Sequence, residues 1–132
     1  MEDLTFVSYL SEENQQFDIA LLSGVIQCVE EPYNLLAESC ARADAVIVNR
    51  LPLSTFEVDR VAVLRPGLLN SKGSYPVHIF SRNTLIQQIS DFAEITSIWM
   101  VPQDSAVIHF KLVQHFGLVL KPIGSKASGV IN

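Results

Sequence analysis

The sequence is short of charge and has no long uniform runs. Of its 132 residues only 17% are charged, the nine Lys and Arg are scattered, and the formal net charge is −5. Nucleic acids are bound mainly through clustered basic side chains, so this composition argues against a nucleic-acid partner. No apolar run approaches the roughly 18 residues of a membrane-spanning helix, so we expect no membrane segment.

Cysteine is also scarce, and the start of the chain lacks the features of an export signal. Met1-Glu2-Asp3 is acidic, whereas a secretory signal begins with basic residues and an apolar run. The two cysteines, Cys28 and Cys40, form no CxxC pair and are expected to be reduced thiols. The sequence therefore predicts a cytoplasmic protein.

The residue patterns of common catalytic and metal sites are missing as well. His109 and His115 would lie about 20 Å apart if one regular strand spanned both, which is too far to bind one metal ion. GxSxG is absent, and no Ser-His-Asp arrangement can be argued. We therefore assign no catalytic residue and no metal ligand from the sequence.

Apolar residues are abundant, at 48% of the chain. This share can fill a core, and in a small domain it favours a buried subunit interface. The length fits one domain. We expect this domain to span residues 1–123, with residues 124–132, which contain Gly and Ser, as a loose tail.

The best-defined pattern is a strand, a helix and a second strand. Phe17–Ser23 is apolar apart from Asp18, which is typical of a strand covered on both faces in a parallel sheet. Pro32 suits the first turn of a helix, and apolar residues at helical spacing continue to about Ala43. Asp44–Leu51 is a second buried strand. Together they predict a βαβ unit.

The remaining patterns complete an α/β fold with a mixed sheet of about five or six strands and two main helices. Ser81 is a good cap for a helix over Arg82–Phe92. Other segments are expected to form strands, turns and loops: strands at Leu4–Leu10, Arg60–Arg65, Val77–Phe80 and Glu94–Val101, a turn at Pro102–Ser105, a long loop at Pro66–Ser74, and an extended stretch over Ala106–Leu120 broken near Gln114.

Several of these segments share a resemblance. Phe17–Gln27, followed by Glu31–Leu36, resembles a family of bacterial S-adenosylmethionine-dependent methyltransferases of class I, which have a Rossmann-like fold. The resemblance covers roughly residues 4–120 and continues through four further motifs: Asn49–Leu53, Asp59-Arg60, Ser74–Pro76 and Phe80-Ser81. Two positions depart from the family pattern, since Cys28 stands where Tyr is expected and Asn49 where Asp is expected.

The resemblance implies a truncated sheet. The family orders its strands 3-2-1-4-5-7-6, and Leu4–Leu10 would be the third strand, Phe17–Ser23 the fourth and Asp44–Leu51 the fifth. Glu94–Val101 and the region Phe110–Lys121 would be the last two. The family's first strand ends in a glycine-rich cofactor loop, and none of the six glycines here forms GxGxG. We therefore expect no cofactor for the chain alone, S-adenosylmethionine being that of the family.

Removing the first two strands would expose the edge of Phe17–Ser23, and an unpaired apolar edge is an association site. Leu4–Leu10 could fold back beside it, a second copy could pair with it, or another polypeptide could supply the missing half. We favour a homo-oligomer, a dimer formed through Phe17–Ser23.

Candidate ligand-binding residues follow the ends of the buried strands, where ligands sit in open α/β sheets. They are Ser23, Gly24, Gln27, Cys28, Asn49 and Arg50. The alternative is an ordinary turn packed on its neighbours. Asp59-Arg60 could hold a polar ligand or form a surface pair, and Tyr75 and His78 flank a loop that could be a lid or an ordinary exposed loop.

Three functions remain open. The first is a non-catalytic or vestigial methyltransferase-like domain that self-associates. The second is one half of a split methyltransferase, completed by a partner chain with the glycine loop. The third is a small-molecule binding module that uses the cleft after Ser23. We expect the chain alone to be inactive; if it is part of an enzyme, that enzyme is a methyltransferase.

Overall fold

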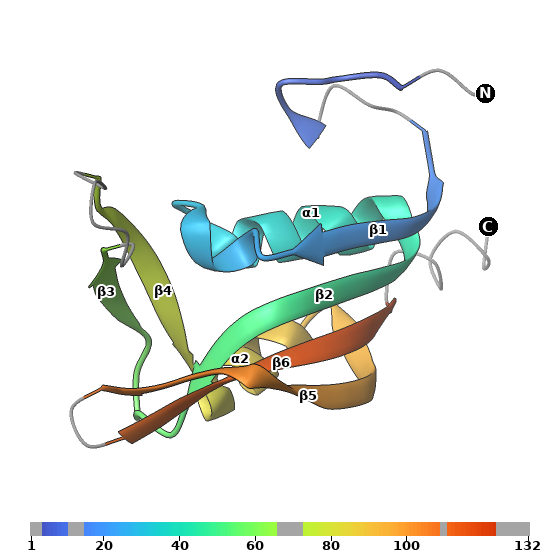
Figure 1. The fold of residues 1–132 in the computed structure, drawn as a ribbon. Helices are drawn as coiled ribbons and strands as arrows, with labels where there is room; N and C mark the ends of the chain where they lie inside the picture. The colour runs from blue at the N-terminus through green and yellow to red at the C-terminus, as the bar shows by residue number, and fades with distance from the viewer. Residues whose placement is uncertain (1–3, 11–14, 66–72, 109–110, 124–132) are drawn as a thin grey trace.

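The computed structural model describes residues 4–10, 15–65, 73–108 and 111–123, which form a curled mixed sheet with two α-helices (Figure 1). The six strands are β1 (Phe17–Ser23), β2 (Ala43–Ser54), β3 (Arg60–Leu64), β4 (Tyr75–Ser81), β5 (Ala93–Ile108) and β6 (Lys111–Pro122). The helices are α1 (Pro32–Arg42) and α2 (Arg82–Ser90), and a short 3-10 turn, η2, spans Ile26–Cys28. The predicted α/β class, mixed sheet and two main helices are confirmed.

The four strands β1, β2, β6 and β5 lie side by side in that order. β1 runs parallel to β2, from Phe17 opposite Ala43 to Ser23 opposite Asn49. β6 is antiparallel to both β2 and β5. This is the 4-5-7-6 order implied by the resemblance, and β1 with α1 and β2 is the predicted βαβ unit.

β2 pairs with two different strands along one of its edges. Its first part pairs with β1, whereas Leu53 and Ser54 at its end pair in parallel with Phe80 and Ser81 of β4. β3 is antiparallel to β4, and this pair turns away from β1 (Figure 1). The carboxyl ends of β2 and β4 therefore meet.

Both helices pack on one face of the sheet. In α1, the buried residues Leu36 and Cys40 lie one turn apart. In α2, Leu85 and Ile89 are also buried and one turn apart. Ser81 begins α2 as predicted, because its Oγ accepts a hydrogen bond from the Thr84 amide at 3.4 Å. The sheet contributes its own buried side chains to this core, among them Val46, Val48, Phe80, Leu118 and Leu120.

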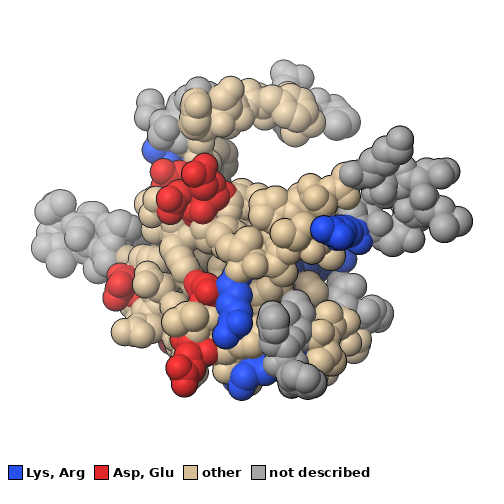
Figure 2. Space-filling view, turned by 90° about the vertical axis from the view of Figure 1, so that its left-hand side faces the viewer, with Lys and Arg blue, Asp and Glu red and all other residues tan. Residues whose placement is uncertain are grey.

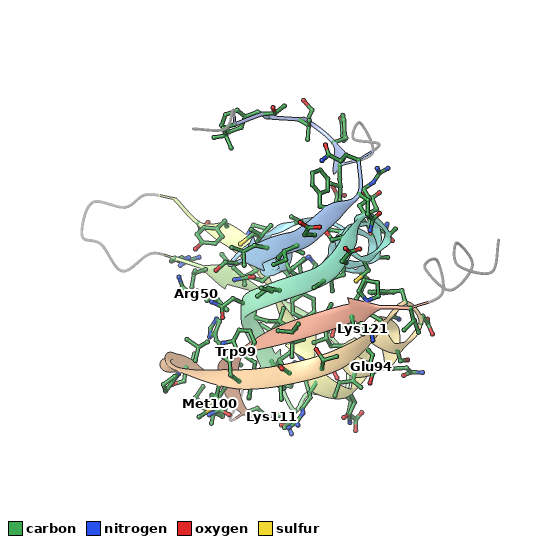
Figure 3. The ribbon with its side chains drawn as sticks, turned by 90° about the vertical axis from the view of Figure 1, so that its right-hand side faces the viewer. Arg50, Glu94, Trp99, Met100, Lys111 and Lys121 are labelled. Carbon is green, nitrogen blue, oxygen red and sulfur yellow. The ribbon has the colours of Figure 1, made fainter. Side chains whose placement is uncertain are left out.

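On the opposite face of β1, β2, β6 and β5, here called the open face, the described residues form no helix (Figure 3). In β1, Ala20 and Leu22 pack against the core, whereas Ile19 and Leu21 are 59% and 65% exposed. Side chains alternate between the two faces of a strand, so Ile19 and Leu21 belong to the open face. The prediction that Phe17–Ser23 is covered on both faces is therefore wrong within the described residues.

The predicted strand at Leu4–Leu10 is also wrong. This segment bends at Ser8, has no strand neighbour among the described residues, and lies clear of the sheet (Figure 1). Phe6 is 85% exposed. A strand obtains its backbone hydrogen bonds only from a neighbour, so a strand-forming sequence alone does not make one. The segment does not fold back beside β1.

Two predicted boundaries near the carboxyl end are wrong. Pro102–Ser105 is not a turn, because β5 continues through it with a shift in register against β6 between Val101 and Ser105. An edge strand tolerates the proline and the bulge. No break occurs at Gln114, which pairs within the hairpin. The predicted tail and most of the predicted loop at Pro66–Ser74 lie outside the described residues.

Candidate functional site

The carboxyl end of β1 is closed by a turn. Gly24 has a φ of 68°, a left-handed conformation that glycine adopts without a steric penalty. Its amide donates to the Asn49 carbonyl at 3.0 Å, which ties the turn to β2. The chain then enters η2, where Ile26 is fully buried in the core. The predicted glycine turn after β1 is therefore present, and its backbone is engaged.

A bulge in β2 lies beside this turn. The pairing of β2 with β6 shifts between Val48 and Leu51, and Arg50 has a φ of 59°, which is uncommon outside glycine. The Gln27 side-chain amide donates to the Arg50 carbonyl at 3.1 Å. Gln27 therefore helps to hold the bulge in place.

Five of the six predicted site residues thus come together. Ser23 pairs with Asn49, Gly24 bonds to Asn49, and Gln27 bonds to Arg50. The sixth, Cys28, is an exposed free thiol that lines a separate pocket. Two of the polar contacts in this group are internal hydrogen bonds, from Gly24 to Asn49 and from Gln27 to Arg50.

Asn49 adds an unusual feature to the group. Its Oδ1 atom is buried and has no hydrogen-bond partner among the described residues. Leaving a buried acceptor unpaired costs about 1–3 kcal/mol, and such groups often mark a functional position. The structure therefore gives Asn49 more weight than the sequence did.

Gly117 and Trp99 complete this part of the open face, and the sequence analysis missed both. Gly117 lies in β6 between the partners of Val48 and Leu51, so it faces the bulge, and it pairs with Trp99 of β5. The Trp99 indole lies over Gly117, where a Cβ would overlap it. Trp99 and Arg50 both lie on the face seen in Figure 3. A glycine inside an apolar strand often marks a close approach of another group, so Gly117 could have been noticed in the sequence.

A pocket of about 310 Å³ lies between η2 and the β3–β4 pair. It is lined by Cys28, Val29, Glu30, Val61, Pro76 and His78. The His78 Nε2 is 2.9 Å from the Val29 carbonyl oxygen, and the ring stacks on Phe80. His78, predicted to flank a loop, therefore connects the segment after η2 to β4.

Asp59 holds the start of α2. Its two carboxylate oxygens accept hydrogen bonds from the Tyr33 hydroxyl at 2.5 Å and the Ser81 amide at 2.6 Å. Burial, followed by the hydrogen bond to Asp59 and its charge, raises the pKa of Tyr33 well above the ordinary value. Arg60 does not pair with Asp59 but lies over the Phe56 ring, 4.2 Å from its centre. Asp59 therefore has a structural role.

A second pocket of about 410 Å³ opens where the carboxyl ends of β2 and β4 meet. Its lining is polar at the start of α2 and apolar further along, with Ser54, Thr55, Phe56, Arg82, Asn83 and Ile86. Ser54 Oγ accepts from the Phe56 amide at 3.2 Å, which fixes the loop that forms one wall. These residues were not predicted as a site, because the strand expected from the sequence ended at Leu51 whereas β2 continues to Ser54.

The described surface gives no sign of a metal centre or a membrane span. Among the described residues, no three His, Cys, Asp or Glu side chains gather closely enough to bind a metal ion. No helix in the described part of the chain is long and apolar enough to cross a membrane. On the face shown in Figure 2, acidic and basic side chains occur in small separate groups.

Comparison with known proteins gives a likeness in fold. No protein-family model and no curated protein matches the sequence. Two similar solved structures are the N-terminal domain of EvdMO1 in the presence of SAH and D-fucose, with a TM-score of 0.55, and the same domain with SAH bound, with a TM-score of 0.54. Sequence identity is 14% in both.

The extent of these matches matters for their interpretation. They cover 87% and 89% of this chain but only 51% and 53% of the neighbours. The chain thus spans about half the length of the structures it matches. At this level of identity the likeness shows the fold alone, which is the α/β fold of that domain.

Proposed function

We propose that this chain is a self-associating, non-catalytic domain of methyltransferase-like fold in which two copies join at the free edge of β1. The observation that carries the proposal is the position of β1. Among the described residues it pairs with β2 alone, and Ile19 and Leu21 are more than half exposed. A long apolar edge of this kind readily pairs with another strand.

The direction of the backbone groups in β1 supports this proposal. The Gly24 amide points toward β2, where it meets the Asn49 carbonyl. Backbone groups of successive residues in a strand point alternately to its two sides. The N–H and C=O groups of Ile19, Leu21 and Ser23 therefore point away from β2 and are available to a further strand.

The polar groups that follow β1 are used within the fold, which argues against a catalytic or ligand-binding role for them. The Gly24 amide and the Gln27 side-chain amide both bond to backbone carbonyls of β2. These groups stabilise the turn and the bulge, which is the alternative that the sequence left open. We therefore place the function at the β1 edge rather than at its carboxyl end.

The test is the oligomeric state of purified protein, measured by size-exclusion chromatography with light scattering. We expect a dimer for the unchanged chain and a monomer for Leu21→Lys, because a lysine on an edge strand opposes pairing. Val61→Lys is the matched control. Val61 is 61% exposed on β3, which is also an edge strand, and its substitution should leave the dimer intact. A monomeric unchanged chain, or dimeric Leu21→Lys, would contradict the proposal.

A second candidate function is one half of a methyltransferase completed by another polypeptide. Two observations favour it: the neighbours that share the fold were solved with SAH, and this chain matches about half of them. Further strands would join at β1. Calorimetric titration of SAH into the dimer separates the two functions. Micromolar binding by the chain alone would favour a cofactor-related role and count against a purely associative one.

A further inference from the structure

We propose that the strand covering β1 is Leu4–Leu10 of a second copy, so that the two copies exchange these segments reciprocally. The inference rests on the proposed self-association and specifies its partner strand. Leu4–Leu10, here called the arm, has a strand-forming sequence but pairs with no strand among the described residues, and β1 pairs with β2 alone among them and keeps one free edge. Each supplies what the other lacks.

The arm is exposed along its length. Phe6 and Tyr9 are 85% and 69% exposed, and both are large side chains that normally lie in a core or an interface. Figures 1 and 2 both show residues 4–10 held away from the body of the protein. Within one copy the arm therefore leaves its own β1 uncovered, which favours pairing with another copy.

The arm and β1 match in length and in pattern. Each has seven residues, a length of roughly 23 Å in an extended strand. In an arm paired as a strand, Leu4 and Phe6 would lie on one face, just as Ile19 and Leu21 lie on one face of β1. Register in a sheet follows the apolar pattern, so we expect these four side chains to share the open face.

The exchanged arms would bury enough surface for a stable dimer. An aromatic side chain buries about 150–250 Å², and each arm brings two of them to its partner. With Leu4 and Val7 and the exposed side chains of β1, two arms bury on the order of 1,200–1,600 Å² in total, the range of specific protein interfaces. A single pairing of β1 with β1 would bury much less.

A complementation experiment tests the exchange. Phe6→Asp disables the arm, and Leu21→Lys disables the edge, so each variant alone is expected to be monomeric. Mixed in equal amounts they should form a heterodimer, because the Leu21→Lys copy offers an intact arm and the Phe6→Asp copy offers an intact edge. Native mass spectrometry distinguishes the heterodimer by mass. Val58→Asp, at a position 61% exposed and outside both segments, should remain a dimer.

The outcomes distinguish the swapping of arms from the proposed self-association at the β1 edge. If Phe6→Asp stays dimeric and Leu21→Lys is monomeric, the β1 edges pair directly and only the arm exchange is overturned. If both variants stay dimeric, or the unchanged chain is monomeric, both proposals fail. The arm amides could also be protected from hydrogen–deuterium exchange in a monomer. This result would mean that the arm pairs with β1 of its own copy, and it would also overturn the inference.

Hydrogen–deuterium exchange on the unchanged protein provides a measurement independent of the variants. In the dimer, the amides of Leu4–Leu10 and those of Ile19, Leu21 and Ser23 should be protected together. Dilution to a largely monomeric state should remove both protections in parallel. Protection of the β1 amides without protection of the arm amides would overturn the proposed swapping of arms. Circular dichroism of each variant is the control for folding.

Discussion

Gly117 shows how strongly one residue can constrain the open face. Its lack of a side chain lets the Trp99 indole lie directly on β6. Gly117→Ala should displace the indole and lower the free energy of unfolding by about 1–3 kcal/mol, the usual cost of overpacking. Trp99 is the one tryptophan of the chain, so its fluorescence reports the displacement directly. An unchanged emission maximum with unchanged stability would contradict this packing.

Tyr33 should make the fold sensitive to alkali. Its pKa in the folded protein is raised, chiefly by burial, above the ordinary value of about 10. Its contribution to stability is therefore complete below pH 10 and is lost as the pH rises from there toward the folded-state pKa, because the unfolded chain releases the proton first.

Urea unfolding at about pH 9 and about pH 11 measures this effect against the ordinary tyrosine pKa. Tyr33→Phe keeps the ring against Phe80 but removes the ionisable hydroxyl that bonds to Asp59. The stability lost between the two pH values should be smaller in this variant than in the unchanged protein. An equal loss in both proteins would show that Tyr33 does not carry the effect.

At the scale of elements, α2 depends on Ser81, the N-cap residue that precedes its first turn. Ser81 is fully buried, caps the helix through its Oγ, and donates its own amide to Asp59. Ser81→Ala should lower the free energy of unfolding by about 1 kcal/mol, the typical value of a lost cap. Ser90→Ala is the matched control, because this exposed serine at the other end of α2 bonds only to the Gln87 carbonyl. Equal losses would contradict the role of the cap.

The elements show what the sequence could predict. β1 was predicted with its observed bounds, because a continuous apolar run before a glycine is a strong local signal. Leu4–Leu10 was predicted as a strand from the same kind of evidence and is wrong, because pairing depends on a neighbour that the local sequence does not reveal. Pro102–Ser105 failed for a related reason, since an edge strand absorbs a proline that a central strand would reject.

The candidate site was predictable in part for the same reasons. Parallel pairing of β1 and β2 follows from the βαβ pattern, and it brings Ser23 and Gly24 to Asn49. The bulge at Arg50 depends on the register of β6, which lies far away in the sequence, and no local pattern specified it. Trp99 and Gly117 matter only because of that register, so they were missed.

At the scale of the whole molecule, self-association should appear in thermal unfolding. If folding and dimer formation are linked, each tenfold increase in protein concentration adds about 1.4 kcal/mol of stability per dimer. The Tm measured by calorimetry should therefore rise with concentration for the unchanged protein and for Val61→Lys. It should be independent of concentration for Leu21→Lys, and a Tm that never varies would argue against a dimer.

The place of β6 between β2 and β5 has a consequence for biosynthesis. β6 is synthesised after the other five described strands, yet its Leu118 and Leu120 fill the core beside Val46 and Val48 of β2. The βαβ unit therefore emerges first, and one side of β2 stays unpaired until β6 has been made. Such a nascent chain exposes apolar strand edges during translation, and exposed edges of this kind favour aggregation.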